Sequence, residues 1–293
     1  MNDYLTTREV ATLLRIKERK VYDLVASGRI PCSRAMGKLL FPKAAIEDWV
    51  VGNTPKSGFG GSGTVRPNVV LGSHDPLLDW ALRESQAGLA AYFSGSTDGL
   101  NRYLLSEGVA SGLHIRDAKS KDWNVAKVSG VCKDLPVVLV EWVRRERGLI
   151  VAPNHAARVK GLPDIADLRV VPRQHDAGAQ LLFVELLEDV SLKFQKMRTA
   201  EVARNEFDAA MAVLEGKADV CFGLASLAVQ LGLTFVPIIE ERYDLLVDRW
   251  AWFEPPMQRL LDFSRGSAFR KRAQEFAGCD SSRLGDVHYN GPE

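Results

Sequence analysis

The chain has 293 residues, of which 46% are hydrophobic and 26% charged, and its formal net charge is +1. This composition is typical of a globular protein with buried cores, and the length suggests about two domains. The longest apolar stretches, such as LPVVLV, are far shorter than the roughly 20 residues that cross a membrane, and the first ten residues lack a signal-peptide pattern. We therefore expect a cytoplasmic protein without a membrane partner.

Basic residues are concentrated at the start of the chain. Residues 1–50 contain nine Lys and Arg against six Asp and Glu, whereas residues 67–293 contain 27 against 31. A basic head on an acidic body is typical of a nucleic-acid-binding segment attached to a second domain. The cysteines have no C-x-x-C spacing, so we expect free thiols and neither a metal site nor a cofactor; they are Cys32, Cys132, Cys221 and Cys279.

The first 50 residues predict a winged helix-turn-helix. Thr6 and Glu9 have the spacing of a capping box and predict the start of a helix in TTREVATLL. A turn at RIKE precedes a second helix, RKVYDLVASG, which Gly28 ends. IPCSRAMGKLLFP predicts a hairpin wing with Gly37 at its tip, and PKAAIEDWV predicts a closing helix.

Residues 51–66, VGNTPKSGFGGSGTVR, contain five glycines and predict a flexible linker. From residue 67 to residue 293, strand-like and helix-like segments alternate. This alternation predicts an α/β fold with mostly parallel sheets, and the length suits two lobes. The strand-like segments are NVVLGS, LAAYFSGS, ASGLHI, PVVLV, GLIVAP, LRVVPRQ, ADVCFGL and LTFVPII.

The ordered set T-x-x-E-V-A-x-L-L, K-V-Y-D-L-V-A-S-G-R-I-P and G-K-L-L-F-P-K-x-A-I-E-D-W resembles the excisionase-type, MerR-like helix-turn-helix module. The resemblance implies binding to double-stranded DNA, with the second helix in the major groove. Long basic side chains at the start of that helix can reach guanine edges or phosphates, and those on the wing can reach flanking phosphates. The candidate DNA-contacting residues are Thr7, Lys17, Arg19, Lys20, Tyr22, Arg34 and Lys38. A single small head binds weakly, so we expect a homodimer or higher homo-oligomer.

Three loops of the body place small hydroxyl residues where a strand gives way to a helix. VVLGSHDPLL contains Ser73, YFSGSTDGL contains Ser94, Ser96 and Thr97, and VCFGLASLAV contains Ser226. Helix N-termini offer unpaired N–H groups and a partial positive charge, and open sheets bind ligands at the carboxyl ends of their strands. Any one of these residues could instead be an ordinary helix cap.

The body motifs, among them GSTDGLNRYLLSEGVASGLHIRD and GKADVCFGLASLAVQLGLTFVPIIEERYDLLV, resemble periplasmic-binding-protein-like domains of the type II class, which includes molybdate and tungstate binders. The resemblance implies two lobes that close by hinge motion, with crossovers near VEWVRRERGLIVAP and IIEERYDLLV. It also implies a bound oxyanion effector such as molybdate or tungstate. The candidate ligand-binding residues are Ser73, Ser94, Ser96, Thr97, Arg173, Gln174, Ser226 and Tyr243.

Together these features favour a ligand-responsive transcription regulator rather than an enzyme. The sequence contains no G-x-S-x-G motif, no phosphate loop and no metal-ligand spacing. We expect His114 and His175 to lie near the cleft as hydrogen-bonding groups rather than metal ligands. Two alternatives stay open: an excisionase-like architectural DNA binder whose body is an assembly platform, and an enzyme or accessory protein of molybdenum-cofactor metabolism.

Overall fold

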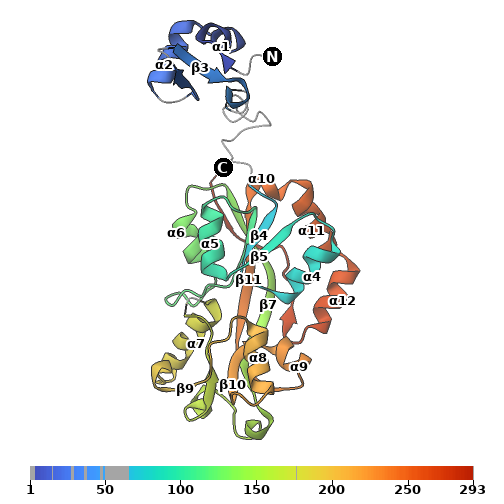
Figure 1. Ribbon diagram of the computed structural model, residues 1–293. Helices are drawn as coiled ribbons and strands as arrows, with labels where there is room; N and C mark the ends of the chain where they lie inside the picture. The colour runs from blue at the N-terminus through green and yellow to red at the C-terminus, as the bar shows by residue number, and fades with distance from the viewer. Residues whose placement is uncertain are drawn as a thin grey trace. The chain divides into compact units, whose positions relative to one another are not determined.

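The computed structural model describes residues 4–14, 16–27, 30–35, 38–46, 49, 66–175 and 177–292 (Figure 1). The chain divides into two compact units, Met1–Thr64 and Val65–Glu293. Residues 51–65 of the expected linker lie outside the described residues, as do Gly28 and Gly37. No helix among the described residues is long and apolar enough to cross a membrane.

The first unit has the predicted winged helix-turn-helix arrangement. The capping box is confirmed: the Thr6 N–H donates to Glu9 Oε2 at 2.7 Å, and the Glu9 N–H donates to Thr6 Oγ1 at 3.4 Å. Val10, Val21 and Phe41 are fully buried in its core. Residues 43–46 are helical, and a three-stranded sheet has the order β1-β3-β2. Its other elements are β1 (Tyr4–Leu5), α1 (Thr7–Leu13), α2 (Glu18–Ala26), β2 (Ser33–Ala35) and β3 (Lys38–Pro42).

The second unit has two lobes that share one ten-stranded sheet, with β5-β4-β6-β11-β7-β10-β8-β9 as its main order. Two strands of 15 residues, β7 (Val137–Val151) and β11 (Thr234–Asp248), run through both lobes (Figure 1). They are the two crossovers that the sequence predicts. Each lobe adds shorter strands to one end of this central pair and packs helices against them.

The first lobe surrounds the amino-terminal half of β7 and the carboxyl-terminal half of β11. Its core contains Leu77, Leu78, Trp142, Tyr243 and Phe269, which are at most 1% exposed. Its elements are β4 (Val69–Gly72), α4 (Pro76–Glu84), β5 (Ala90–Phe93), α5 (Ser96–Leu104), β6 (Ala110–Leu113), α6 (Val125–Val131), α10 (Arg249–Trp252), α11 (Pro255–Arg265), α12 (Ser267–Glu275), β12 (Cys279–Asp280) and β13 (Val287–Asn290).

The second lobe surrounds the other halves of the two long strands. Val159, Ile165, Phe183 and Leu187 are buried in one of its two hydrophobic clusters. Its elements are three short 3-10 helices, Pro153–His155, Leu162–Ile165 and Phe194–Lys196, with β8 (Arg169–Val171), α7 (Gly178–Asp189), β9 (Arg198–Thr199), α8 (Glu206–Leu214), β10 (Val220–Leu224) and α9 (Ala225–Gln230).

The expectation of a mostly parallel sheet was wrong at its centre. Parallel pairs occur within each lobe, between β4 and its neighbours β5 and β6, and between β8 and its neighbours β9 and β10. The long pair β7–β11 is antiparallel, and β6 and β10 join it in antiparallel register. The predicted strands PVVLV and GLIVAP are one strand, because the charged segment between them is also part of β7.

Gly112 packs closely against the Tyr243 side chain. A Cβ added to it would lie 1.8 Å from the Tyr243 hydroxyl oxygen, and Tyr243 is fully buried. We therefore expect Gly112→Ala to lower the free energy of unfolding by about 1–3 kcal/mol or more, as overpacking does. Gly130→Ala on α6 is the control, because nothing lies within 4 Å of the added carbon and a helical alanine should gain about 0.5–1 kcal/mol. Urea titration measures both changes, and equal stability of the two variants would contradict this packing.

Candidate ligand-binding cleft

A cavity of about 420 Å³ lies between the two lobes of the second unit. The first lobe contributes residues at the carboxyl ends of β4, β5 and β6: Ser73, His74, Phe93, Ser94, Gly95 and His114. The second lobe contributes residues 173–174, 177–179 and 204–206, which lie around the starts of α7 and α8. Ligands of open α/β sheets bind in this place, outside the carboxyl ends of parallel strands.

Four of the predicted ligand-binding residues come together in this cavity. Ser73 and Ser94 line it from the first lobe, and Arg173 and Gln174 line it from the second. His114, which the sequence places near the cleft, lines it as well. The structure places these residues around one cavity, and their roles in ligand binding stay predictions.

The other four predicted residues do not line the cavity. Ser96 is 1% exposed and its Oγ accepts a hydrogen bond from the His114 N–H at 3.1 Å. Thr97 is half-buried on α5. Tyr243 is fully buried and its hydroxyl donates to the Ser73 carbonyl oxygen, so it fixes the Ser73 loop from beneath.

Ser226 opens onto a different pocket, which it lines together with Pro76, Arg272 and Phe276. The sequence shows that a helix follows β10, but not which face of the sheet that helix covers. His74, Phe93 and the segment 204–206 line the cleft without having been predicted to do so. No motif marks them, because the fold brings them together from separate loops.

Ser73, His114 and Glu241 form a line of polar groups that leads from the cavity into the protein. Ser73 Oγ lies 2.8 Å from His114 Nε2, and His114 Nδ1 lies 3.1 Å from Glu241 Oε2. The imidazole ring is 3% exposed. This order of groups resembles a hydrolase triad, but the Ser73 N–H donates to the Gly112 carbonyl oxygen at 2.9 Å. It is therefore not free to stabilise an oxyanion formed on Ser73, as a triad serine's own N–H does.

A buried network of charges holds Glu241. Arg145 Nη2 and Arg147 Nε both donate to its carboxylate, the second at 2.7 Å, and Arg145 Nη1 reaches Asp75 at 2.9 Å. Burial alone would raise the pKa of Glu241, but the two guanidinium groups outweigh it and hold the pKa well below its usual range. The network continues to the cavity, because Arg147 Nη2 also donates to Glu206 Oε1 at 2.9 Å.

Among the described residues, Arg173 has no such carboxylate partner. Its Nη2 donates to the Arg204 carbonyl oxygen at 3.3 Å, and its Nε is buried without a hydrogen-bond partner among the described residues. Burial lowers the pKa of this guanidinium, which indicates incomplete solvation of the charge. A partly buried guanidinium that lacks a carboxylate partner can form charge-assisted hydrogen bonds with an incoming anion.

Two helix N-termini at the cavity add to this positive character. α5 begins after Gly95 and α7 begins after Ala177, and neither has a side-chain cap. The Asn205 side chain, by contrast, caps α8 by accepting from the Asp208 N–H at 2.7 Å. The first N–H groups of an uncapped helix have no partner in the helix and carry a partial positive charge. The cleft is therefore suited to a negatively charged group.

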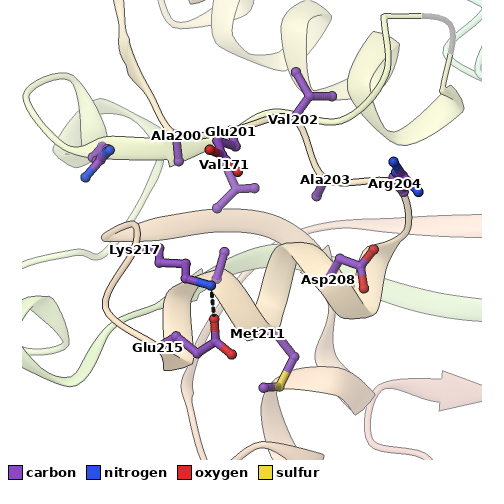
Figure 2. Close-up of a pocket in the computed structure, with 12 residues that line it drawn as sticks. Val171, Ala200, Glu201, Val202, Ala203, Arg204, Asp208, Met211, Glu215 and Lys217 are labelled. Carbon is purple, nitrogen blue, oxygen red and sulfur yellow. Dashed lines mark ion pairs between the residues drawn. The ribbon is translucent and has the colours of Figure 1, made fainter.

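A larger cavity of about 680 Å³ lies wholly within the second lobe, beside α8 (Figure 2). Its charged lining is balanced between basic and acidic side chains, and Lys217 Nζ pairs with Glu215 Oε2 at 2.6 Å. A ligand bound there would contact one lobe and would not draw the two together. The smaller cleft is the better candidate for a site that controls the arrangement of the lobes.

The first unit exposes most of the predicted DNA-contacting residues. Arg19 and Tyr22 lie one turn apart on α2, on the side away from the buried Val21. Lys17, Lys20 and Lys38 are exposed, and Thr7 is the half-buried first residue of α1. Arg34 lies on β2, but its side chain is outside the described part of the chain. The four cysteines are free, and no group of His, Cys, Asp and Glu among the described residues could hold a metal ion.

Comparison with known proteins agrees with both units. The model of the PBP superfamily domain matches residues 80–265, and a helix-turn-helix domain model matches residues 4–53. The uncharacterized protein YvgK of Bacillus subtilis (strain 168) is 24% identical over 259 residues, which cover 83% of this chain and 84% of YvgK.

Two solved structures illustrate the likeness in fold. A putative phosphate ABC transporter substrate-binding protein with bound phosphate, from Clostridium perfringens, is 11% identical with a TM-score of 0.50, covering 75% of this chain and 98% of that chain. The ancestral amino acid-binding protein AncCDT-1 is 13% identical with a TM-score of 0.49, covering 71% of this chain and 93% of that chain. At 11% identity the likeness to the phosphate-binding protein concerns the fold alone.

Removing the Glu241 charge should strongly destabilise the protein. Glu241→Gln leaves Arg145 and Arg147 buried without their shared carboxylate, for which we expect a loss of about 3–5 kcal/mol in the free energy of unfolding near pH 7. The neighbouring Glu240→Gln is the control, because the Glu240 side chain is 55% exposed in its pair with Arg144 and such pairs contribute about 1 kcal/mol or less.

The difference in the free energy of unfolding between wild type and Glu241→Gln should depend on pH. Since the folded-state pKa of Glu241 lies well below the ordinary value of 4.5, its carboxylate stabilises the fold fully above that value. The contribution falls as the pH drops below 4.5, because the unfolded chain then takes up a proton that the folded chain does not. Urea titrations across this pH range measure the difference in the free energy of unfolding between the two proteins. A difference that grows on acidification would contradict the lowered pKa of Glu241.

Proposed function

The chain belongs to the PBP superfamily, and we propose that it is a ligand-responsive, DNA-binding transcription regulator whose two-lobed body senses a small anion. The observation that carries this proposal is the cleft between the lobes. A half-buried guanidinium without a carboxylate hydrogen-bond partner among the described residues lines one cavity there with two uncapped helix N-termini, in the same chain as a helix-turn-helix domain. The proposal gives the protein no enzymatic activity.

The route from ligand to DNA is part of the proposal. Anion binding draws Arg173 of the second lobe and the Ser73–His114 side of the first lobe together, by bending of β7 and β11. A ligand changes DNA binding only if it has different affinities for the DNA-bound and free states. We propose that the protein is a homodimer and that the ligand changes how its two helix-turn-helix domains are arranged on double-stranded DNA. We also propose that the protein is cytoplasmic, where DNA is accessible.

The identity of the effector is the finer hypothesis. A tetrahedral oxyanion, molybdate or tungstate, is the effector that the sequence favours, and dipoles of N–H and O–H groups can hold such an ion without a countercharge. Phosphate and sulfate have the same tetrahedral shape and serve as comparison ions. The residues for which we propose ligand contact are Ser73, Ser94, Arg173 and Gln174, since they line the cleft.

DNA binding by α2 should depend on Arg19. If Arg19 neutralises a DNA phosphate, Arg19→Ala should reduce the slope of log K against log salt concentration by about one. Fluorescence anisotropy of the full chain on a labelled duplex measures this slope. Arg259→Ala, at an exposed position on α11 of the body, is the control and should leave the slope unchanged. An unchanged slope for Arg19→Ala would remove this residue from the phosphate contacts.

Arg173 should control both ligand affinity and the DNA response. Isothermal titration of the full chain with molybdate, tungstate, sulfate and phosphate identifies the ions that bind. Loss of a charge-assisted contact of about 1.5–3 kcal/mol in Arg173→Ala should weaken their binding about 10- to 100-fold. Arg198→Ala, which is exposed on β9 and does not line the cleft, should bind them normally.

The effect of the ligand on DNA binding can be measured separately from ligand binding. A saturating concentration of an ion that binds should change the affinity of the full chain for an operator sequence selected from random DNA. The same ion should have no effect on DNA binding by Arg173→Ala. Binding of the ion without any change in DNA affinity would rule out the regulator and leave only a binding protein.

A further inference from the structure

The hydrogen-bond directions in the cleft restrict which anions fit, beginning with Ser73. The carboxylate of Glu241 faces His114 Nδ1 at 3.1 Å, and a lone pair on that nitrogen would be repelled, so Nδ1 carries the ring proton. Nε2 is then an acceptor, and the Ser73 hydroxyl donates to it at 2.8 Å. Ser73 thus offers lone pairs, not a proton, to a ligand.

Ser94 is restricted in the same way. Its hydroxyl donates to Asp98 Oδ2, which also accepts from Arg102 Nε at 2.7 Å. The hydrogen bond from Ser94 and the one from Arg102 lower the pKa of Asp98, so this carboxyl group is ionised and has no proton to return. Both cleft serines, which the sequence suggests as donors to an anion, therefore act as acceptors toward the cavity.

Glu206 adds a third acceptor on the opposite lobe. Its Oε1 accepts from Arg147, while its Oε2 is buried and has no hydrogen-bond partner among the described residues. Burial raises the pKa of Glu206, but Arg147 outweighs this effect and the pKa lies below the ordinary value. An ionised oxygen without a donor is costly to bury, and a ligand that supplies a donor removes this cost.

The residues that line the cavity thus fall into two groups, one that attracts negative charge and one that accepts hydrogen bonds. Arg173 and the N-termini of α5 and α7 suit a negative group, whereas Ser73 and Ser94 offer lone pairs and Glu206 has a carboxylate oxygen without a donor among the described residues. The volume of about 420 Å³ lies within the range of about 300–1,000 Å³ that is usual for organic ligands. Phe93, whose ring packs edge-on against His74 at 5.5 Å, supplies an apolar surface that an inorganic ion does not use.

We infer that the effector is a small organic anion that carries its own hydrogen-bond donor, a hydroxyl or an ammonium group, rather than a fully deprotonated oxyanion such as molybdate. The inference rests on the proposed function and names the class of ligand for the same cleft. The anionic group binds Arg173 and the helix N-termini, and the donor binds the serine oxygens and Glu206.

Three carboxylates of similar size test the need for a donor. Propanoate has none, lactate adds a hydroxyl and alanine adds an ammonium group at the same carbon. Titrated against the full chain, lactate or alanine should bind at least tenfold more tightly than propanoate, because propanoate leaves the acceptors unpaired. The tighter of the two identifies the donor. Equal affinities, or no binding by any of the three, would overturn the inference.

A second pair of ions tests the same point without a change of shape. At about pH 8, hydrogen phosphate and sulfate are both tetrahedral dianions, and only phosphate carries an O–H. We expect phosphate to bind at least tenfold more tightly than sulfate. Sulfate or molybdate binding as tightly as phosphate would contradict the inference, even if that ion altered DNA binding and so supported the proposed function.

Asp98→Ala tests the serine directly. Without its carboxylate acceptor, the Ser94 hydroxyl can donate to a ligand, so the preference for phosphate over sulfate should fall several-fold. The ratio of the two affinities is the readout, because removal of an acidic residue near a helix N-terminus strengthens the binding of any anion. Asp262→Ala, which removes a carboxylate paired with Arg265 on α11, is the control and should keep the ratio. An unchanged ratio in Asp98→Ala would overturn the role given to Ser94.

Glu206→Gln tests the opposite wall. The amide replaces the free carboxylate oxygen and removes its charge, so the preference for alanine or lactate over propanoate should shrink. All these readouts concern ligand binding alone. Failure of the DNA response would therefore leave the ligand class standing, and failure of the donor preference would leave the regulator standing.

Discussion

The carboxylate of Glu241, enclosed between Arg145 and Arg147, is the interaction on which the arrangement of the body depends. Glu241 lies directly opposite Arg145 in the antiparallel pair of β11 and β7, the two strands that pass through both lobes. All three side chains are almost completely buried. Burying three charges is costly unless each has a partner, so these two strands are held in one register and the crossover is fixed at this point.

The same carboxylate acts on the cleft through His114. Because Glu241 faces one nitrogen of the ring, it determines which nitrogen is left for Ser73 and therefore the direction of the Ser73 hydroxyl. Arg147 extends the network to Glu206 on the second lobe. Structural stability and the proposed ligand preference thus depend on one group of charges, and a change in the network should alter both.

The sequence predicts the elements of this fold better than it predicts the site. Thr6 and Glu9 determine the first helix through local spacing, and local signals of this kind can be found without tertiary contacts. The segment EWVRRER within β7 could not be identified as strand interior, because its charges are typical of a surface and their partners lie about 90 residues away on β11. Ser226 was misplaced because strand order and strand ends do not reveal which face of a sheet a following helix covers.

Hydrogen-bond direction is a further property that composition and spacing do not contain. Ser73 and Ser94 are correctly expected at strand ends, and both line the cleft, yet each has its proton committed to a neighbour. Their partners differ in origin: Asp98 is four residues from Ser94, whereas His114 and Glu241 reach Ser73 only through the sheet. A cleft with acceptors on both lobes and a cationic group on one lobe is best satisfied by a ligand with two unlike ends. Such a ligand must contact both lobes at once, which is the physical condition for binding to be coupled to closure.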